Sequence, residues 1–150
     1  MNLTTKEQGL LADLKKQEQL CIDKYTKYAN EACDPNLKNL FTSIKTTEEH
    51  HLNTINDILA GKTPNVNNGG SSPVDSVCTN APTPAGCNTQ NDAYLCQDAL
   101  SMEKAVSSLY DISIFEFSND ELRNVLNGIQ KQEQEHGKKI YDYMSNHQMY

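Results

Sequence analysis

The sequence has little positive charge, no long apolar run and no paired cysteine motif, and each absence excludes a class of protein. It has 13 lysines and arginines against 20 aspartates and glutamates, a formal net charge of −7. We expect neither nucleic acid nor an anionic membrane as a partner, because both attract basic patches. No apolar run approaches the length of a transmembrane helix, about 18 residues, and the polar start of the chain is not typical of a secretory signal. We therefore expect a protein that stays in the cell that makes it.

The five cysteines are an odd number and lack the Cys-x-x-Cys spacing of zinc and redox motifs. Cys21 and Cys96 fall on apolar helix positions, where a free thiol packs as a small hydrophobic group. Cys78 and Cys87 bracket a proline-rich stretch and could pair in an oxidising compartment. The sequence leaves open whether they do.

What the chain does contain is four stretches with apolar residues at alternating steps of three and four, the period of an amphipathic helix. With 150 residues and 37% hydrophobic content, the chain is long enough to bury one core. Polar residues interrupt the apolar face of every stretch. They are Glu18, Glu48, His51, Glu103, Glu133 and His136.

These six residues form one pattern written twice, a glutamate followed by Glu-x-x-His. Each member of the first copy recurs 85 residues later, so that Glu18 corresponds to Glu103 and Glu48 to Glu133. Turn signals at 33–36 and 118–120 lie midway between the two glutamates of each copy. Two antiparallel helices folded there carry both glutamates about 22 Å from the turn, at 1.5 Å per residue. A duplicated helical hairpin explains the repeat and predicts that all six side chains meet in one layer.

The stretch 61–90 is rich in glycine, proline, asparagine and serine and has no helical period. If the third helix runs parallel to the second, this stretch must travel the length of the bundle, roughly 35–40 Å. Long crossovers of this kind distinguish the ferritin-like bundle from other four-helix folds. We predict a single all-α domain over 1–150, a ferritin-like four-helix bundle of two αα-hairpins (5–60 and 91–146) joined by a long crossover linker (61–90).

Four carboxylates and two imidazoles in one layer suit two transition-metal ions, iron or manganese. Carboxylate bundles that hold two iron or two manganese ions use Glu and Glu-x-x-His in this way. Without cations, protons would have to neutralise the buried glutamates. We predict that the six residues bind metal, and that the core residues Tyr25 and Tyr110, also 85 apart, donate hydrogen bonds to the site carboxylates. Two alternatives stay open: a radical or electron-relay role for the tyrosines, and a polar network that holds no metal.

The second hairpin resembles the coat F family of spore coat proteins, and the first hairpin resembles the same unit more weakly. The likeness rests on the order of short motifs: Met102-Glu-Lys-Ala, Asn119-Asp-Glu-Leu-Arg, Gln132-Glu-Gln-Glu-His-Gly-Lys-Lys-Ile-Tyr-Asp-Tyr-Met and the final Met149-Tyr150. It implies an endospore-forming bacterium, synthesis in the mother-cell cytoplasm, deposition in the spore coat, other coat proteins as partners and a ferritin-like fold. The six polar residues also match the ligand order of ferritin-like di-metal proteins, in which a tyrosine like Tyr25 often lies near the site.

Two functions follow from these patterns. The first is a spore coat protein whose ferritin-like bundle has a dinuclear metal-binding site. The alternative is a di-iron or di-manganese oxidoreductase that consumes peroxide or oxidises ferrous iron, so enzymatic activity is left open. Storage in a mineral-filled cage is a weaker third reading, since the chain lacks a further short helix after the bundle. A homodimer is the default expectation, because most homo-oligomers are twofold.

Overall fold

The computed structural model describes residues 1–65 and 72–150, and there it contains four long α-helices and one short 3-10 helix. The long helices are α1 (Thr5–Glu31), α2 (Pro35–Leu59), α3 (Thr89–Glu116) and α4 (Asp120–Asn146), and the 3-10 helix η1 spans Pro73–Ser76. The described residues form no strand, so the predicted all-α helical bundle is confirmed. None of the helices in these ranges is long and apolar enough to cross a membrane.

Local signals in the sequence set the helix starts. Thr4 and Glu7 form a reciprocal capping box at the start of α1, in which each side chain accepts a hydrogen bond from the other residue's backbone N–H. Asp34 caps α2, and Pro35 occupies its first position, where a missing N–H costs nothing. Asn119 caps α4 in the same way. Both turns between paired helices therefore fall where the sequence predicts them.

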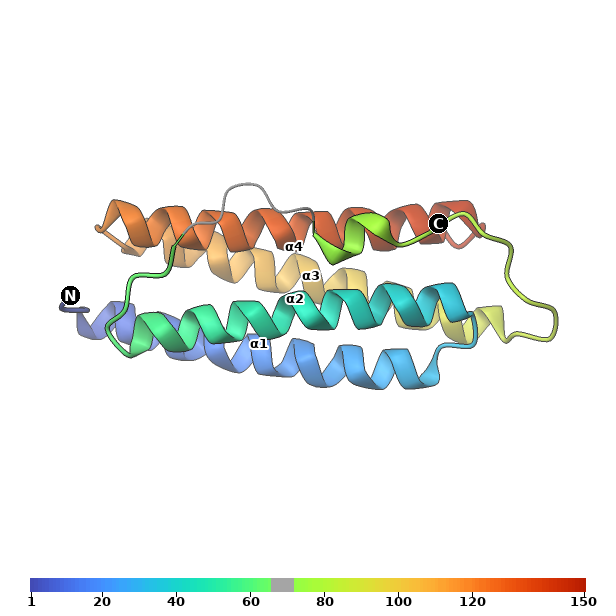
Figure 1. Cartoon of the computed structure of the whole chain (residues 1–150), viewed down its shortest axis with the longest axis horizontal. Helices are drawn as coiled ribbons and strands as arrows, with labels where there is room; N and C mark the ends of the chain where they lie inside the picture. The colour runs from blue at the N-terminus through green and yellow to red at the C-terminus, as the bar shows by residue number, and fades with distance from the viewer. Residues whose placement is uncertain (66–71) are drawn as a thin grey trace.

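The helices lie side by side along one long axis (Figure 1). α1 packs against α2 in one antiparallel hairpin and α3 against α4 in the other, while α1 also contacts α3 and α2 contacts α4. α2 and α3 run in the same direction, so the end of α2 and the start of α3 lie at opposite ends of the bundle (Figure 1). The two hairpins thus present four inner faces to one core.

The stretch between the hairpins departs from the expectation in two details. It contains η1, which begins with a capping box between Ser72 and Asp75 and buries Val74 against the bundle. A helix of four residues is too short to show a hydrophobic period, which is why the sequence pattern missed it. α3 also begins at Thr89, two residues before the predicted hairpin boundary, because Asn88 supplies its N-cap.

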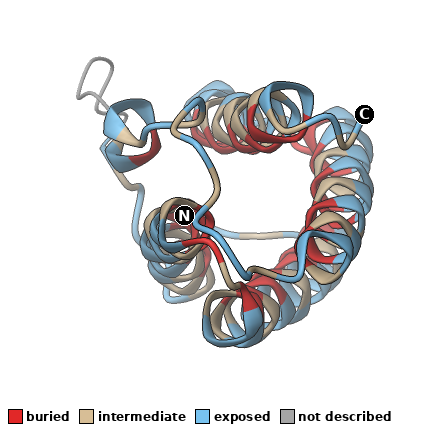
Figure 2. Ribbon diagram, turned by 90° about the vertical axis from the view of Figure 1, so that its right-hand side faces the viewer, coloured by how far each residue is buried: buried red, intermediate tan, exposed pale blue. Residues whose placement is uncertain are grey.

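Buried residues lie along the inner faces of the helices (Figure 2). Most are apolar, as the steps of three and four predict, and the thiols of Cys21 and Cys96 lie free among them, with no solvent exposure. The larger members of this core are Leu11, Leu14, Tyr25, Leu37, Leu40, Phe41, Ile44, Ile55, Ile58, Tyr110, Leu122, Leu126, Ile140 and Tyr143. The six polar residues of the repeat are therefore buried within a hydrophobic core.

A disulfide bond links Cys33, in the α1–α2 turn, to Cys87, just before α3. The alternative pairing of Cys78 with Cys87 is wrong, and Cys78 is free and exposed. The chain connects opposite ends of the bundle between α2 and α3, and this brings residue 87 beside a turn that is 54 residues away in sequence. Spacing along the chain could not show that contact.

A buried hydrogen-bond network reinforces the same end of the bundle. Asp92 on α3 accepts hydrogen bonds from the backbone N–H groups of Cys33 (2.9 Å) and Asp34 (3.1 Å). Tyr143 on α4 donates to the Asp34 carboxylate at 2.6 Å. These contacts join the α1–α2 turn to the other hairpin. They hold the inner faces of the two hairpins in a fixed relation, which a site built from both hairpins requires.

Candidate metal centre

All six polar residues of the repeat meet in one layer, although they come from four different helices. Glu18 lies on α1, Glu48 and His51 on α2, Glu103 on α3, and Glu133 and His136 on α4. None of the six is more than 2% exposed. Within each Glu-x-x-His pair, the spacing of three residues puts both side chains on one face of the helix.

The six residues divide into two overlapping groups that could each hold a metal ion. One group contains Glu18, Glu48, His51 and Glu133, and the other contains Glu48, Glu103, Glu133 and His136. Within each group, one potential ligand atom from every residue lies within 4.8 Å of the others. Glu48 and Glu133 belong to both groups. If each group held an ion, these two carboxylates would be shared between the two groups.

Both histidines direct Nδ1 at the carboxylates. His51 Nδ1 lies 2.9 Å from Glu133 Oε1 and 3.1 Å from Glu48 Oε2. His136 Nδ1 lies 3.1 Å from Glu48 Oε1. The two rings stack with their centroids 6.0 Å apart. Each imidazole thus faces its own group with the same nitrogen.

Two buried tyrosines cross between the hairpins and hold one carboxylate each. Tyr25 on α1 donates to Glu103 Oε1 on α3 at 2.5 Å, and Tyr110 on α3 donates to Glu18 Oε1 on α1 at 2.5 Å. The hydrogen bonds predicted from the repeat are therefore present. Burial, together with the neighbouring carboxylates, raises the pKa of both hydroxyls well above the ordinary value, so they stay donors at neutral pH.

Burial and mutual repulsion govern how the layer holds protons. Burial, reinforced by repulsion from Glu48, raises the pKa of Glu18 to about 8. Burial and repulsion from Glu103 raise the pKa of Glu133 well above its ordinary value. Burial also acts to raise the pKa of Glu48, but hydrogen bonds from His136 and His51 outweigh it and hold that pKa well below the ordinary range.

The histidines respond in the opposite sense to burial. Burial acts to lower the pKa of both rings, but contacts with the surrounding carboxylates outweigh it and raise the pKa of His51 and His136 well above the ordinary value. Without a cation, the layer therefore holds protons on its imidazoles and on part of its carboxylates. A bound cation must displace those protons.

Buried polar atoms without a hydrogen-bond partner indicate whether cations would fit the layer. Among the described residues, Glu18 Oε2, Glu103 Oε2, Glu133 Oε2 and His136 Nε2 are buried without a hydrogen-bond partner. Buried polar atoms are nearly always paired, so three bare carboxylate oxygens in one layer point to a positive partner. Four carboxylates also balance the charge of two divalent cations when both imidazoles are neutral. The donor set therefore fits two such ions.

Two contacts around the layer were not predicted from the sequence. His51 Nε2 lies 2.6 Å from Gln132 Oε1 on α4. Tyr28, which packs edge-on against Tyr25 with ring centroids 5.7 Å apart, donates to Asp98 on α3. Gln132 precedes Glu133 directly, where the first copy of the repeat has a threonine, so a comparison of the two copies could have found it.

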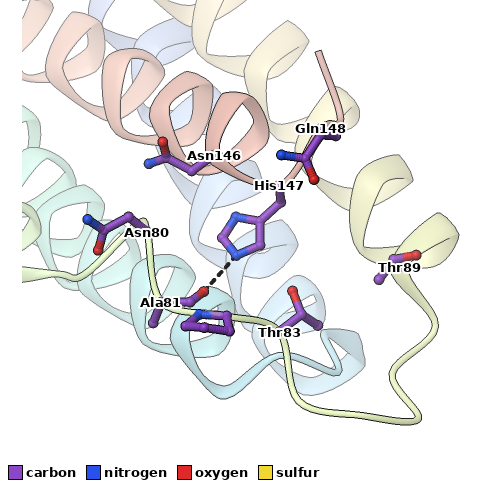
Figure 3. Close-up of a pocket in the computed structure, with 8 residues that line it drawn as sticks. Asn80, Ala81, Thr83, Thr89, Asn146, His147 and Gln148 are labelled. Carbon is purple, nitrogen blue, oxygen red and sulfur yellow. Dashed lines mark hydrogen bonds between the residues drawn. The ribbon is translucent and has the colours of Figure 1, made fainter.

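A polar pocket of about 540 Å³ lies where the C-terminal end of α4 meets residues 80–83 and the start of α3 (Figure 3). His147 projects into this region, with Nε2 2.9 Å from the carbonyl oxygen of Ala81 (Figure 3). The other lining residues are Asn80, Pro82, Thr83, Thr89, Asn146 and Gln148. None of the six layer residues reaches this pocket. It is therefore separate from the candidate metal centre.

The family model of the Coat F domain matches residues 91–150, which cover nearly all of α3, all of α4 and the end of the chain. No curated protein and no solved structure matches the chain. The family match includes every motif on which the resemblance of the second hairpin rests. The resemblance of the second hairpin to the coat F family is therefore confirmed, and residues 91–150 are similar to the Coat F domain.

Proposed function

We propose that this protein is a component of the bacterial spore coat whose ferritin-like bundle binds two transition-metal ions, iron or manganese, in the six-residue layer. The match to the Coat F domain supports a location in the spore coat, because the resemblance of the second hairpin to that family implies a spore coat protein. It also supports other coat proteins as partners. Synthesis in the mother-cell cytoplasm and a homodimeric state belong to the same proposal.

The parallel course of α2 and α3 supports the ferritin-like assignment. A bundle with short connections alternates in direction at every step, whereas two hairpins with parallel central helices need a chain that returns along the bundle. The polar layer appears at the same height in both hairpins, and the bonds from Tyr25 to Glu103 and from Tyr110 to Glu18 are related by the same repeat. This pseudo-twofold arrangement supplies two similar ligand groups side by side, which suits two adjacent metal ions.

One observation carries the metal proposal: Glu48 and Glu133 belong to both ligand groups. Their carboxylates would bridge the two ions, while Glu18 and His51 would complete one coordination shell and Glu103 and His136 the other. Iron and manganese accept this mixture of carboxylate and imidazole ligands. Tyr25 and Tyr110 would orient the terminal carboxylates Glu103 and Glu18 through their hydroxyl hydrogen bonds.

A second candidate function is that of a di-iron or di-manganese oxidoreductase, which consumes peroxide or oxidises ferrous iron. The size of the ligand set favours it, since six side chains leave coordination positions open on two ions that prefer six ligands each. Bound metal would supply redox chemistry and a binding place for an oxygen species. The chain itself would exclude bulk water from the layer and hold protons on the Tyr25 and Tyr110 hydroxyls.

Metal content and location in the spore test the proposal together. Untagged protein should contain about two transition-metal ions per chain, and Glu48→Gln should lose most of them because it removes a bridging ligand. Glu49→Gln is the matched control, because Glu49 is the next residue but is exposed on α2. The native protein should also remain with the coat fraction of washed spores. A metal-free protein after anaerobic loading, or recovery outside the coat, would contradict the respective half of the proposal.

A peroxide or ferrous-iron assay separates the two candidate functions. Metal-dependent turnover that disappears in Glu48→Gln and persists in Glu49→Gln would establish the oxidoreductase. Full metal occupancy without turnover would leave the ions a structural role in the coat protein.

A further inference from the structure

The two ligand groups are related by the sequence repeat but differ in how their histidines are held. His51 is fixed at both ring nitrogens: Nδ1 faces Glu133 and Glu48, and Nε2 lies 2.6 Å from Gln132 Oε1. His136 is fixed only at Nδ1. Its Nε2 is buried and has no hydrogen-bond partner in the described part of the chain.

A single exchange in the repeat explains the difference. The residue that corresponds to Gln132 in the first copy is Thr47, one position before Glu48. Thr47 is buried, and its short side chain donates to the carbonyl of Ser43 in its own helix at 3.4 Å. It therefore supplies nothing to His136 among the contacts of the described residues.

The contact with Gln132 determines what His51 can offer a metal ion. A carboxamide oxygen only accepts hydrogen bonds, so Nε2 of His51 must carry the hydrogen in this contact. A cation that displaces the proton on Nδ1 therefore meets the lone pair of that nitrogen, on the side of the ring where Glu18, Glu48 and Glu133 lie. A hydrogen bond at the distal nitrogen also fixes the ring orientation and makes the ligating nitrogen more basic.

We propose that Gln132 makes the two metal subsites unequal, so that the first divalent transition-metal ion binds with Glu18 and His51 and the second binds with Glu103 and His136. Gln132 is thus a positioning residue that acts through His51. The inference rests on the proposed function, because it assigns an order to the two ions. Loss of a hydrogen bond of this kind typically weakens metal binding about 10- to 100-fold.

Anaerobic titration of metal-free protein with manganese(II), with free ion measured by electron paramagnetic resonance, tests the role of Gln132. Wild-type protein should bind two ions in two steps whose dissociation constants differ by about 10- to 100-fold. Gln132→Ala should weaken the first step by a similar factor and leave the second unchanged. Gln132→Glu keeps an acceptor oxygen and should restore the tight step.

Gln130→Ala is the matched control. Gln130 lies on the same helix and makes one hydrogen bond, from Nε2 to the carbonyl of Ser107 at 3.1 Å, so its loss removes a comparable contact away from His51. Both manganese steps should stay unchanged in this variant. An equal loss of the tight step in Gln130→Ala would attribute the effect to the helix rather than to Gln132, and would overturn the proposal.

A second pair of variants locates the first ion and does not depend on Gln132→Ala being folded. Glu18 belongs only to the His51 group and Glu103 only to the His136 group, and each accepts one hydrogen bond from a tyrosine. Glu18→Gln should abolish the tight step, whereas Glu103→Gln should abolish the weak one. If Glu18→Gln abolishes the weak step and Glu103→Gln the tight one, or if both ions bind wild-type protein with the same dissociation constant, the proposal of unequal subsites is wrong. Either result would still be compatible with a dinuclear centre. Absence of manganese binding in the wild type overturns the proposed metal centre itself.

Discussion

The hydroxyl of Tyr110 on α3 donates a hydrogen bond of 2.5 Å to Glu18 Oε1 on α1, and the side chains at both ends are fully buried. Tyr25 on α1 makes the equivalent bond to Glu103 on α3, in the opposite direction. Each tyrosine thus ties its own hairpin to a glutamate of the other hairpin. The polar layer and the contact between the hairpins therefore depend on each other.

Tyr110→Phe should destabilise the metal-free protein by about 1–3 kcal/mol, because it leaves a buried carboxyl oxygen without its donor. Tyr25→Phe should cost a similar amount for the same reason. Urea unfolding followed by circular dichroism measures both. Tyr94→Phe, on an exposed part of α3, is the control and should change the free energy of unfolding by less than about 0.5 kcal/mol. Equal stability of all three variants would show that the crossed bonds do not hold the hairpins together.

The metal-free protein should lose stability as the pH rises from about 5 to about 8. The pKa of Glu18 is raised from 4.5 to about 8 by burial, and the pKa values of Glu133, His51 and His136 are also raised. Each of these groups binds its proton more tightly in the folded than in the unfolded chain. The folded state therefore holds more protons across this range, and the free energy of unfolding decreases as they are removed.

Thermal unfolding of chelator-treated protein at several pH values measures this decrease in stability with pH. In Glu18→Gln the side chain at position 18 is neutral at every pH, so stability should depend less on pH than in the wild type. Glu48 does not change the direction of this pH dependence. Its pKa is lowered in the folded protein, so its contribution to stability is lost only in more acidic solution. A melting temperature that rises steadily from pH 5 to pH 8 would be incompatible with the proposed protonation of the layer.

Replacing both Cys33 and Cys87 with serine should lower the free energy of unfolding under oxidising conditions by about 2–4 kcal/mol. The disulfide closes a long loop and so restricts the unfolded chain. Cys78→Ser should have little effect, since that thiol is free and exposed. Wild-type protein in a reducing agent should match the double variant. If the reductant leaves wild-type stability unchanged, the two cysteines are not paired in solution.

Most of the fold was predictable because it depends on local periodicity. Alternating steps of three and four predict which faces are buried, and the turn signals at Asp34-Pro35 and Asn119 predict where the helices begin. The convergence of Glu18, Glu48 and Glu103 followed from their equal distance to the turns. Such inferences need only the helical rise and the repeat.

The features that were missed depend on contacts between distant parts of the chain. The pairing of Cys87 with Cys33, and the bonds from Asp92 to the α1–α2 turn, are set by where the segment between α2 and α3 arrives. The contact of Gln132 with His51 joins α4 to α2 and appears in the sequence only as a departure from the repeat. The helical period does not reveal such contacts, since each depends on how the helices pack in the folded protein.

Anomalous X-ray diffraction from crystals loaded anaerobically with manganese tests the central claim most directly. Two adjacent peaks should lie in the bundle core, both beside Glu48 and Glu133, with His51 next to one and His136 next to the other. Absence of any anomalous peak in this layer, with protein that is folded and fully loaded, would contradict a dinuclear metal centre and leave the six residues as a buried hydrogen-bonded network.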